Sequence, residues 1–223
     1  MIDVRGLYKS FEDKTVLIDI NASFENGKTS LIIGQSGSGK TVLMKCIVGL
    51  LTPEKGEVLY DGRNLVLMGK KEKKMLRKEM GMIFQSAALF DSMSVLDNVM
   101  FPLNMFSNDT LRDRTKRAMF CLERVNLTEA KDKFPGEISG GMQKRVAIAR
   151  ALVNNPAVIL ADEATGNLDT RTSFEILVLF QKLHAEGRTL IFVTHNPEIA
   201  QYSSRNIRLR DGHVVEDTVN PQI

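Results

Sequence analysis

A glycine-rich octapeptide limits what this 223-residue chain can fold into more than any other feature of its sequence. It follows the apolar run 31–33, precedes a helix-like segment at 42–47, and reads Gly34-Gln35-Ser36-Gly37-Ser38-Gly39-Lys40-Thr41. On a strand-to-helix turn, glycines let backbone N–H groups curl around phosphate oxygens, and the N-terminus of the helix adds a favourable dipole. Lys40 would bridge the outer phosphates, and the Thr41 hydroxyl would reach Mg2+. The octapeptide therefore predicts a phosphate-binding loop (P-loop) for a nucleoside triphosphate within an α/β fold.

Length, composition and charge narrow the class of protein. With 43% hydrophobic residues, the chain can bury one sizeable core, with room for a nested subdomain. The formal charge of +3 is small, so we expect no nucleic acid partner. Cys46 and Cys121 lie in helix-like segments and are interpreted as buried thiols in a reducing compartment. Because no signal peptide is visible and no apolar run approaches ~18 residues, we expect a cytoplasmic protein whose membrane span, if it needs one, comes from another polypeptide.

Periodicity and turn residues predict alternating strands and helices around a helical block. Asp109 and Ser139 are expected to cap two helices of this block, the second with Lys144, Arg145 and Arg150 facing outward. We predict a single domain over 1–223, with a nucleotide-binding core at 1–85 and 156–223 and a helical subdomain at 86–155. The predicted fold class is an α/β P-loop NTPase (RecA-like) with a mixed-sheet core, an N-terminal antiparallel β-hairpin region and an inserted α-helical subdomain.

The segment from Lys70 to Lys78 is strongly basic. It holds six basic residues, and Glu72 is the only acid among them. We interpret this run as a solvated helix face, and contact with a membrane surface or a partner is the alternative.

Two adjacent acids, Asp162 and Glu163, follow the apolar strand predicted at 157–161. In a P-loop protein, an acid at the end of such a strand holds Mg2+, usually through a water molecule, and this role suits Asp162. Glu163 is the better candidate for polarising the attacking water, because a carboxylate beside the γ-phosphate can orient the water or accept its proton.

A second phosphate-binding device, Ser139-Gly140-Gly141-Met142, precedes an amphipathic helix. Two glycines and a hydroxyl at a helix N-terminus present N–H donors to an anion. One nucleotide does not need two such devices in the same chain.

Together with Gln85, Leu168-Asp169 and His195, these motifs resemble the ATP-binding cassette (ABC) family over essentially the whole chain. The resemblance implies that 139–142 form the signature segment, which completes the site of a second copy, so that two ATP molecules are sandwiched in a head-to-tail dimer. It also implies roles for single residues: adenine stacking for Phe11, sensing of Mg2+ and of the transmembrane partner for Gln85, a dimer contact for Asp169, and γ-phosphate contact for the switch histidine His195. Magnesium would then be held by Thr41, Gln85 and Asp162.

The chain departs from the family pattern at two positions. Met142 stands where the signature usually has Gln, and Ala164 replaces the Pro that usually follows the catalytic Glu. Since neither change removes a phosphate donor or an acid, we expect ATP hydrolysis to survive.

Subfamily resemblance differs along the chain. The segments 81–90 and 138–145 resemble ATPases of Mla-type phospholipid-trafficking transporters, whereas 161–169 and 193–197 resemble those of macrolide-export and lipoprotein-release systems. We give the first resemblance more weight, because Gln85 and the helical block form the groove that in this family receives the permease. The leading prediction is an ATPase subunit at the inner face of the membrane, driving a permease that moves phospholipid or another amphiphile. The alternative is a macrolide-export or lipoprotein-release ATPase.

Rival classes fit the sequence less well. A soluble, non-transport ABC ATPase would usually show long coiled-coil insertions, zinc-binding cysteines or tandem cassettes, and the sequence has none of these. A P-loop kinase would leave 139–141 without a purpose. A dinucleotide-binding fold is excluded by Lys40-Thr41, because its glycine fingerprint has neither residue at those positions.

Overall fold

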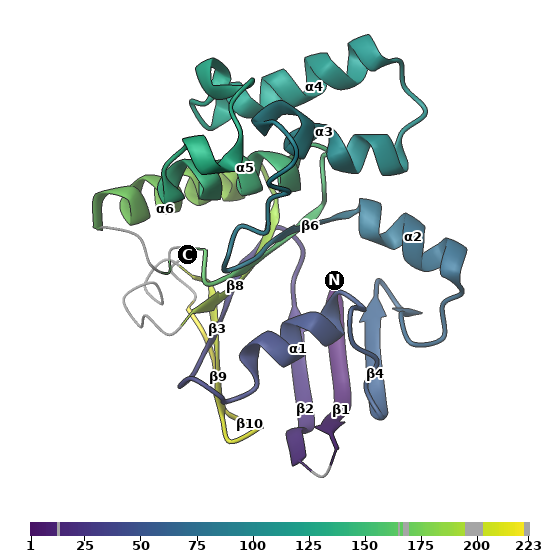
Figure 1. The fold of residues 1–223 in the computed structure, drawn as a ribbon. Coiled ribbons are helices and arrows are strands. Elements are labelled where there is room, and N and C mark those ends of the chain that lie inside the picture. Colours follow the sequence, from purple (N-terminus) through teal and green to yellow (C-terminus); the bar gives the residue numbers. More distant parts are fainter. Residues whose placement is uncertain (13, 165, 167–169, 195–202, 221–223) are drawn as a thin grey trace. The chain divides into compact units, whose positions relative to one another are not determined.

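The computed structural model describes the chain except for residues 13, 165, 167–169, 195–202 and 221–223 (Figure 1). The chain separates into two compact units, one formed by 1–77 with 186–223 and the other by 78–185. Within the described residues, no helix combines the length and apolar character needed to cross a membrane.

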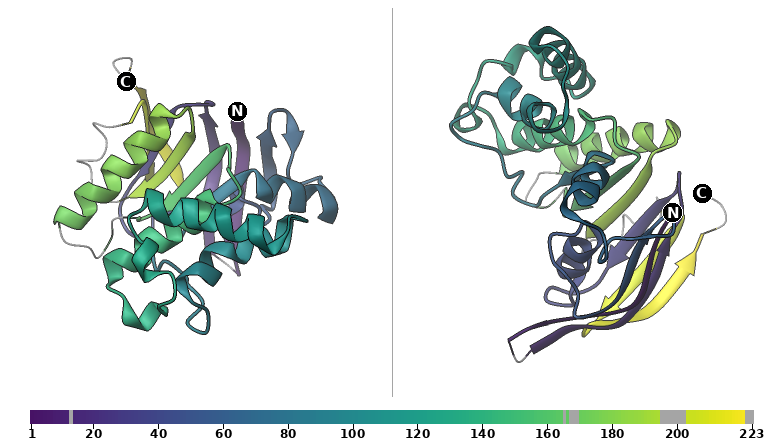
Figure 2. Two further views of the ribbon diagram at one scale, coloured as in Figure 1. Left: turned by 90° about the horizontal axis from the view of Figure 1, so that it is seen from above. Right: turned by 90° about the vertical axis from the view of Figure 1, so that its right-hand side faces the viewer.

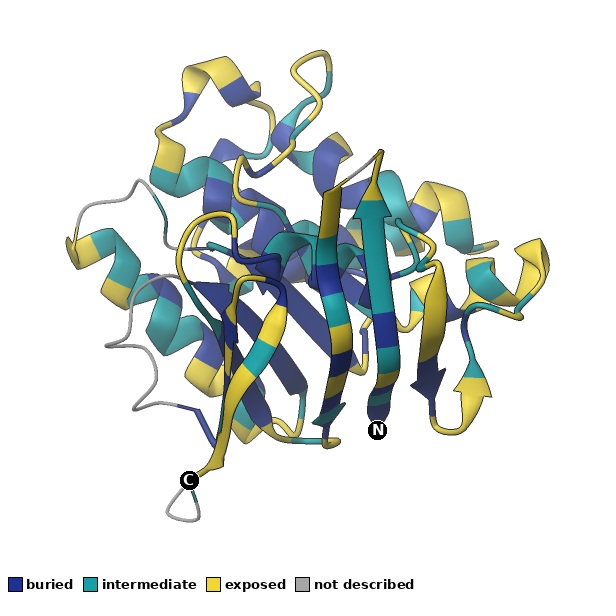
Figure 3. Ribbon diagram, turned by 90° about the horizontal axis from the view of Figure 1, so that it is seen from below, coloured by how far each residue is buried: buried dark blue, intermediate teal, exposed yellow. Residues whose placement is uncertain are grey.

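An antiparallel sheet forms one part of the first unit. Its strand order is β2-β1-β4-β5, and β1 pairs antiparallel with both β2 and β4 (Figure 2). Every second residue tends to be buried, for example Ile20, Ala22 and Phe24 of β2, and the bands of Figure 3 show this alternation. Half-buried alternation is typical of an antiparallel sheet with one face on the core. The strands are β1 (Ile2–Phe11), β2 (Lys14–Phe24), β4 (Lys55–Tyr60) and β5 (Arg63–Asn64).

A parallel arrangement forms the other part of this unit and delivers the P-loop. Strand β3 lies between β8 and β9 and is parallel to both, while β10 pairs antiparallel with β9. Nearly every residue of β3 and β8 is buried, as expected for parallel strands covered on both faces. The elements are β3 (Thr29–Ile33), α1 (Lys40–Ile47), α2 (Lys70–Lys78), β8 (Thr189–Thr194), β9 (Arg205–Arg210) and β10 (His213–Val219).

The second unit combines a parallel strand pair with helices. Strands β6 (Met80–Ile83) and β7 (Val158–Asp162) pair in parallel, with Ile83 opposite Ala161. The helices are α3 (Val95–Phe106), α4 (Leu111–Arg124), α5 (Gly140–Leu152) and α6 (Thr170–Ala185), with short 3₁₀ helices at Thr128–Ala130 and Pro135–Glu137. The predicted α/β fold, with its N-terminal antiparallel strands and a helical block, is confirmed, and the domain boundaries stay a prediction.

Helix caps explain where α4 and α5 begin. The Ser139 hydroxyl accepts the Met142 N–H at 3.3 Å, which confirms the predicted cap of α5. The prediction of Asp109 as the cap of α4 is wrong, because the cap is Thr110. The Thr110 hydroxyl accepts the Asp113 N–H and donates to the Asp113 carboxylate, and this reciprocal pair fixes the first turn one residue later.

Both cysteines are free and buried, as predicted. Burial raises the pKa of the Cys46 thiol to about 12. The Cys121 thiol also has a raised pKa, for the same reason.

Candidate functional site

The P-loop joins β3 to α1 and needs its glycines for two physical reasons. Gly37 and Gly39 have φ angles of +81° and +101°, a region that side chains disfavour. At Gly34, a Cβ would lie 2.3 Å from the carbonyl oxygen of Leu209 and 2.6 Å from Ser38 Oγ. No side chain fits at such separations, so the loop backbone packs directly against the end of β9.

Lys40 is the first residue of α1, and its side chain turns back into the loop. It is buried, and its Nζ donates to the carbonyl oxygens of Gly34 and Gln35, both at 2.8 Å. The ammonium group is thereby held within the curve of backbone N–H groups at the N-terminus of α1. An anion enclosed by the loop would meet both the cation and the positive end of the helix dipole.

A cavity of about 840 Å³ opens beside the loop, between residues 33–38 and the β9–β10 hairpin. Ser38 lies on its wall, and in the described structure its buried Oγ has no hydrogen-bond partner. A buried hydroxyl without a hydrogen-bond partner lowers stability unless a ligand binds it.

Phe11 ends β1 with 43% of its surface exposed, and Lys9 Nζ lies 5.3 Å from its ring centroid. An exposed ring is available for stacking on a base.

In the second unit, the register of two strands brings Gln85 and Glu163 together. Each residue stands two positions beyond the pair Ile83–Ala161, and parallel strands end at the same edge. The Gln85 Nε2 donates to Glu163 Oε2 at 2.7 Å. Glu163 has a φ of +45°, so the backbone turns away from the strand immediately after the buried residue Asp162. The sequence predicted a role for each residue but did not predict this contact.

The donor atoms predicted for Mg2+ suit that ion. A hydroxyl from Thr41, an amide oxygen from Gln85 and a carboxylate from Asp162 are all hard oxygen ligands. The hydrogen bond from Gln85 to Glu163 uses the nitrogen of the Gln85 amide and does not involve its oxygen. No group of three or more His, Cys, Asp or Glu that could hold a metal occurs in the described part of the chain.

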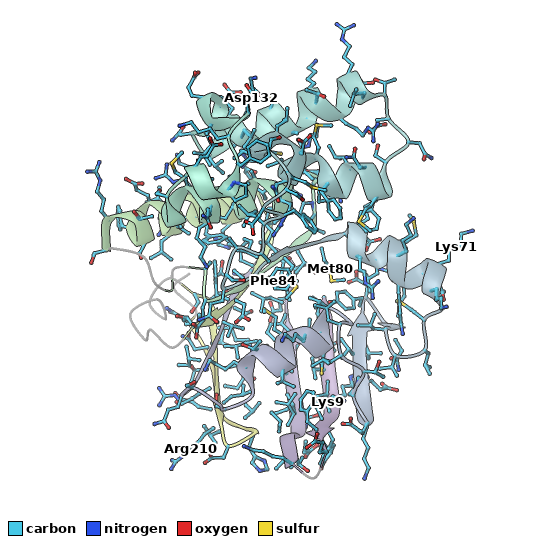
Figure 4. The ribbon with its side chains drawn as sticks, viewed as in Figure 1. Lys9, Lys71, Met80, Phe84, Asp132 and Arg210 are labelled. Carbon is cyan, nitrogen blue, oxygen red and sulfur yellow. The ribbon has the colours of Figure 1, made fainter. Side chains whose placement is uncertain are left out.

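Two cations of α5 hold the segment that follows β6. Lys144 donates to the carbonyl oxygens of Phe84, at 3.4 Å, and Gln85, and Arg150 donates to those of Ala87 and Ala88, both at 2.6 Å. Phe84 is labelled in Figure 4. Burial lowers the pKa of the Lys144 ammonium, and the Asp162 and Glu163 carboxylates act in the opposite direction.

The prediction that these two cations face outward is therefore wrong. Lys144 is buried and Arg150 is half-buried. The segment after β6 forms no strand or helix, so its carbonyl groups need other donors, and Lys144 and Arg150 supply them for Gln85, Ala87 and Ala88. The third cation, Arg145, pairs with Glu175 of α6 and is also half-buried. The signal that could have found this was a pair of long cations, Lys144 and Arg150, on either side of the apolar run 146–149.

The segment 139–142 begins α5, and its two glycines lie in different surroundings. A Cβ on Gly141 would lie 2.7 Å from Thr172 Cγ2, so packing within the chain explains that glycine. A Cβ on Gly140 would meet no described atom within 4 Å. Gly140 is exposed and its φ is not positive, so nothing described in this chain requires a glycine there.

Comparison with known proteins decides the family. The family model described as ABC transporter matches residues 17–166, which include the P-loop, Gln85, the signature segment and both acids. The chain belongs to the ABC transporter family. It is an ATP-binding cassette of that family and it hydrolyses ATP.

Relatives and solved structures agree along nearly the whole cassette. An uncharacterized ABC transporter ATP-binding protein of Methanocaldococcus jannaschii is 41% identical over 221 residues, covering 97% of this chain and 98% of the relative. The macrolide export ATP-binding/permease protein MacB of Shewanella sp. (strain ANA-3) is 41% identical over 226 residues, covering 99% of this chain and 34% of MacB. The cassette thus spans about a third of that relative. The ATP-binding cassette MJ0796, solved as a dimer bound to ADP and Pi, superposes with a TM-score of 0.91 at 34% identity, covering 98% of each chain.

These findings confirm the P-loop fold of an ABC ATPase and the ATPase activity, and they identify an ATP-binding subunit of an ABC transporter. Asp169 and His195, predicted as dimer contact and switch histidine, lie outside the described residues. Ala164, which replaces the usual Pro, is buried directly after Glu163.

Proposed function

We propose that two copies of this cassette close on ATP and drive a membrane-spanning permease, each copy completing the other's site through its signature segment. The observation that carries the proposal is the open surroundings of Gly140 in the signature segment. Gly140 is exposed at the start of α5, and no described atom lies within 4 Å of a Cβ placed there, so this helix N-terminus has room for a ligand or a second copy. The MJ0796 cassette has been solved as a dimer, in one structure bound to ADP and Pi, which supports the pairing of two copies.

Within each site we assign the following roles. The loop 34–41 encloses the phosphates, with Lys40 at the outer ones, and Phe11 stacks on adenine. Thr41, Asp162 and Gln85 would hold Mg2+, which when bound neutralises charge on the β- and γ-phosphates. Glu163 orients the attacking water and accepts its proton, and the amide of Gln85 keeps the carboxylate in place. His195 contacts the γ-phosphate, and Asp169 contacts the second copy.

Substitution of Gly140 tests the composite site. Gly140→Asp adds bulk and negative charge where phosphate donors should face the second copy, yet nothing described within 4 Å opposes it. We expect an unchanged melting temperature and unchanged ATP binding by the monomer, with loss of ATP-dependent dimerisation in light scattering. Gly141→Asp is the matched control, because its Cβ meets Thr172, so it should lower the melting temperature as well. A Gly140→Asp chain that still dimerises on ATP would contradict the proposal.

For the cargo, we place an export system of the macrolide-export or lipoprotein-release type first. It is supported by MacB relatives from Campylobacter jejuni and Shewanella, which match 98–99% of this chain at 39–41% identity. The leading prediction from the sequence, phospholipid trafficking, rests on the resemblance of 81–90 and 138–145, and the relatives described above favour the macrolide-export alternative instead. Because MacB carries ATP-binding and permease functions in one protein, we place the cassette at the cytoplasmic face of the membrane beside its permease.

A chimera separates these alternatives. The ATP-binding part of Shewanella MacB is replaced by this chain, and macrolide resistance is measured in a sensitive host. The export assignment predicts restored resistance, and the same chimera with Glu163→Gln is the control that should give none. A chimera that hydrolyses ATP in membranes without giving resistance would favour another cargo.

A further inference from the structure

Helix α2 concentrates the positive charge of the chain. Its nine residues hold six Lys or Arg and one Glu, a net charge of +5, whereas the whole chain carries +3. The rest of the chain is therefore slightly acidic, at −2. The basic character of the protein is a property of this one helix.

The helix presents its charge on one side. Leu76, only 2% exposed, anchors α2 to its unit. At 3.6 residues per turn, Lys70, Lys71 and Lys74 fall on the side opposite Leu76. All three are exposed, and Lys71 extends outward in Figure 4. We call this set, together with Met75, the outer face of α2.

The acid of the helix is engaged at the N-terminus of the helix. The Glu72 carboxylate accepts the N–H of Gly69 at 2.8 Å and so is used in starting the helix. Its position lies on the side of Leu76, away from the three lysines. Apolar groups accompany the charge instead: Met75 is 58% exposed on the outer face, and Leu67, just before the helix, is 82% exposed.

We propose that the outer face of α2 binds the anionic headgroup surface of a phospholipid bilayer. Lysines attract anionic headgroups, and exposed Met and Leu side chains can enter the boundary of the acyl region. A nucleic acid backbone or an acidic protein segment would satisfy the lysines but offers less for the apolar pair. The inference relies on the proposed function for bringing the cassette to a membrane, and it adds a direct contact with lipid.

Vesicle binding tests the proposal without a permease. Purified chain is sedimented with vesicles of phosphatidylcholine alone or with about 30% phosphatidylglycerol, at roughly 0.1 M salt. We expect binding to the anionic vesicles only, weakening as salt rises. Since each lysine near such a surface strengthens binding about fivefold, the triple variant Lys70→Gln, Lys71→Gln, Lys74→Gln should bind on the order of 100-fold more weakly.

Two control variants make the result specific. Lys116→Gln, Lys133→Gln, Lys182→Gln removes the same charge from exposed positions elsewhere and should keep vesicle binding. Replacing the three α2 lysines by Arg keeps the charge and should also keep binding. All variants should hydrolyse ATP at the unmodified rate, which verifies folding. Equal binding to both kinds of vesicle, no binding to anionic vesicles, or equal losses in the two Gln variants would overturn the proposal. ATP-dependent dimerisation would be unaffected by such a failure, so the proposed function is tested separately.

Discussion

The side-chain amide of Gln85 donates a 2.7 Å hydrogen bond to the carboxylate of Glu163, across the ends of two parallel strands. The residue proposed to sense Mg2+ thus also holds the proposed catalytic carboxylate. Movement of the segment after β6 would displace Glu163 directly. Lys144 and Arg150 of α5 donate hydrogen bonds to that segment. The signature helix α5 is therefore linked to the Glu163 carboxylate through hydrogen bonds within one unit.

Removing the Gln85 amide should therefore impair turnover more than binding. A hydrogen bond to a charged group contributes about 1.5–3 kcal/mol, so Gln85→Ala should lower kcat by on the order of 10- to 100-fold with little change in KM. Gln85→Glu places a second carboxylate at the same contact and should reduce kcat further. Steady-state ATPase measurements decide this, and an unchanged kcat for Gln85→Ala would mean that Glu163 needs no such support.

Lys40 should be needed for nucleotide binding itself. Lys40→Ala removes the ammonium held inside the P-loop, so calorimetry should show ATP affinity lower by about an order of magnitude or more. Lys28→Ala, at an exposed position of the same unit, is the control and should bind ATP normally. If Lys40→Ala kept the unmodified dissociation constant, the P-loop assignment would fail.

The α5 cations should matter for stability. Lys144→Met leaves the carbonyl group of Gln85 without its Lys144 donor, at a cost of about 1–3 kcal/mol, whereas the Phe84 carbonyl still accepts the Ala87 N–H. In a chain of this size, about 1 kcal/mol corresponds to roughly 2–4 °C in melting temperature. Arg145→Met, which breaks a partly exposed ion pair with Glu175, should cost less than about 1 kcal/mol. Equal melting temperatures for the two variants would contradict a structural role for Lys144.

The buried thiol of Cys46 should be unreactive at neutral pH. Burial raises its pKa from 9.0 to about 12, so at pH 8 the native thiol stays protonated. Alkylation should be slow in the native protein and fast after unfolding. Between pH 9 and 12, the folded chain retains a proton that the unfolded chain has lost, so this thiol makes folding stability fall as the pH rises. Rapid alkylation of the native protein at pH 8 would show that Cys46 is not buried.

The sequence predicted those parts of the fold and site that depend on neighbouring residues. The P-loop, the Ser139 cap and the acids after β7 follow from local spacing. The Gln85–Glu163 contact could not be predicted in this way, because it depends on the register of strands 78 residues apart in the chain. The inward orientation of Lys144 was missed because helix periodicity groups apolar residues and cannot show that nearby carbonyl groups need a buried donor. The Thr110 cap was missed because Asp109 is an equally good capping residue by type.

Mixing two inactive variants tests whether each site draws on both copies. Ser139→Arg and Lys40→Ala should each be inactive as homodimers, whereas their mixed dimer has one site with both halves intact. Part of the ATPase activity should return on mixing, provided that one intact site can turn over independently. Native mass spectrometry verifies that mixed dimers form. As a second readout, Glu163→Gln is added to both chains, and each mixed dimer should then retain one ATP. Absence of both rescue and retention would place the whole site in one chain.

If Glu163 activates the water that attacks ATP held between two copies of this cassette, the molar mass of the Glu163→Gln variant should depend on ATP. The amide keeps the shape of the side chain but cannot accept the proton of water, so ATP should remain bound and trap the dimer. Size-exclusion chromatography with light scattering should then give twice the 24.9 kDa mass of the chain with ATP, and the single mass without it. A chain that binds ATP but keeps the single mass, or that hydrolyses ATP at the unmodified rate, would contradict the account.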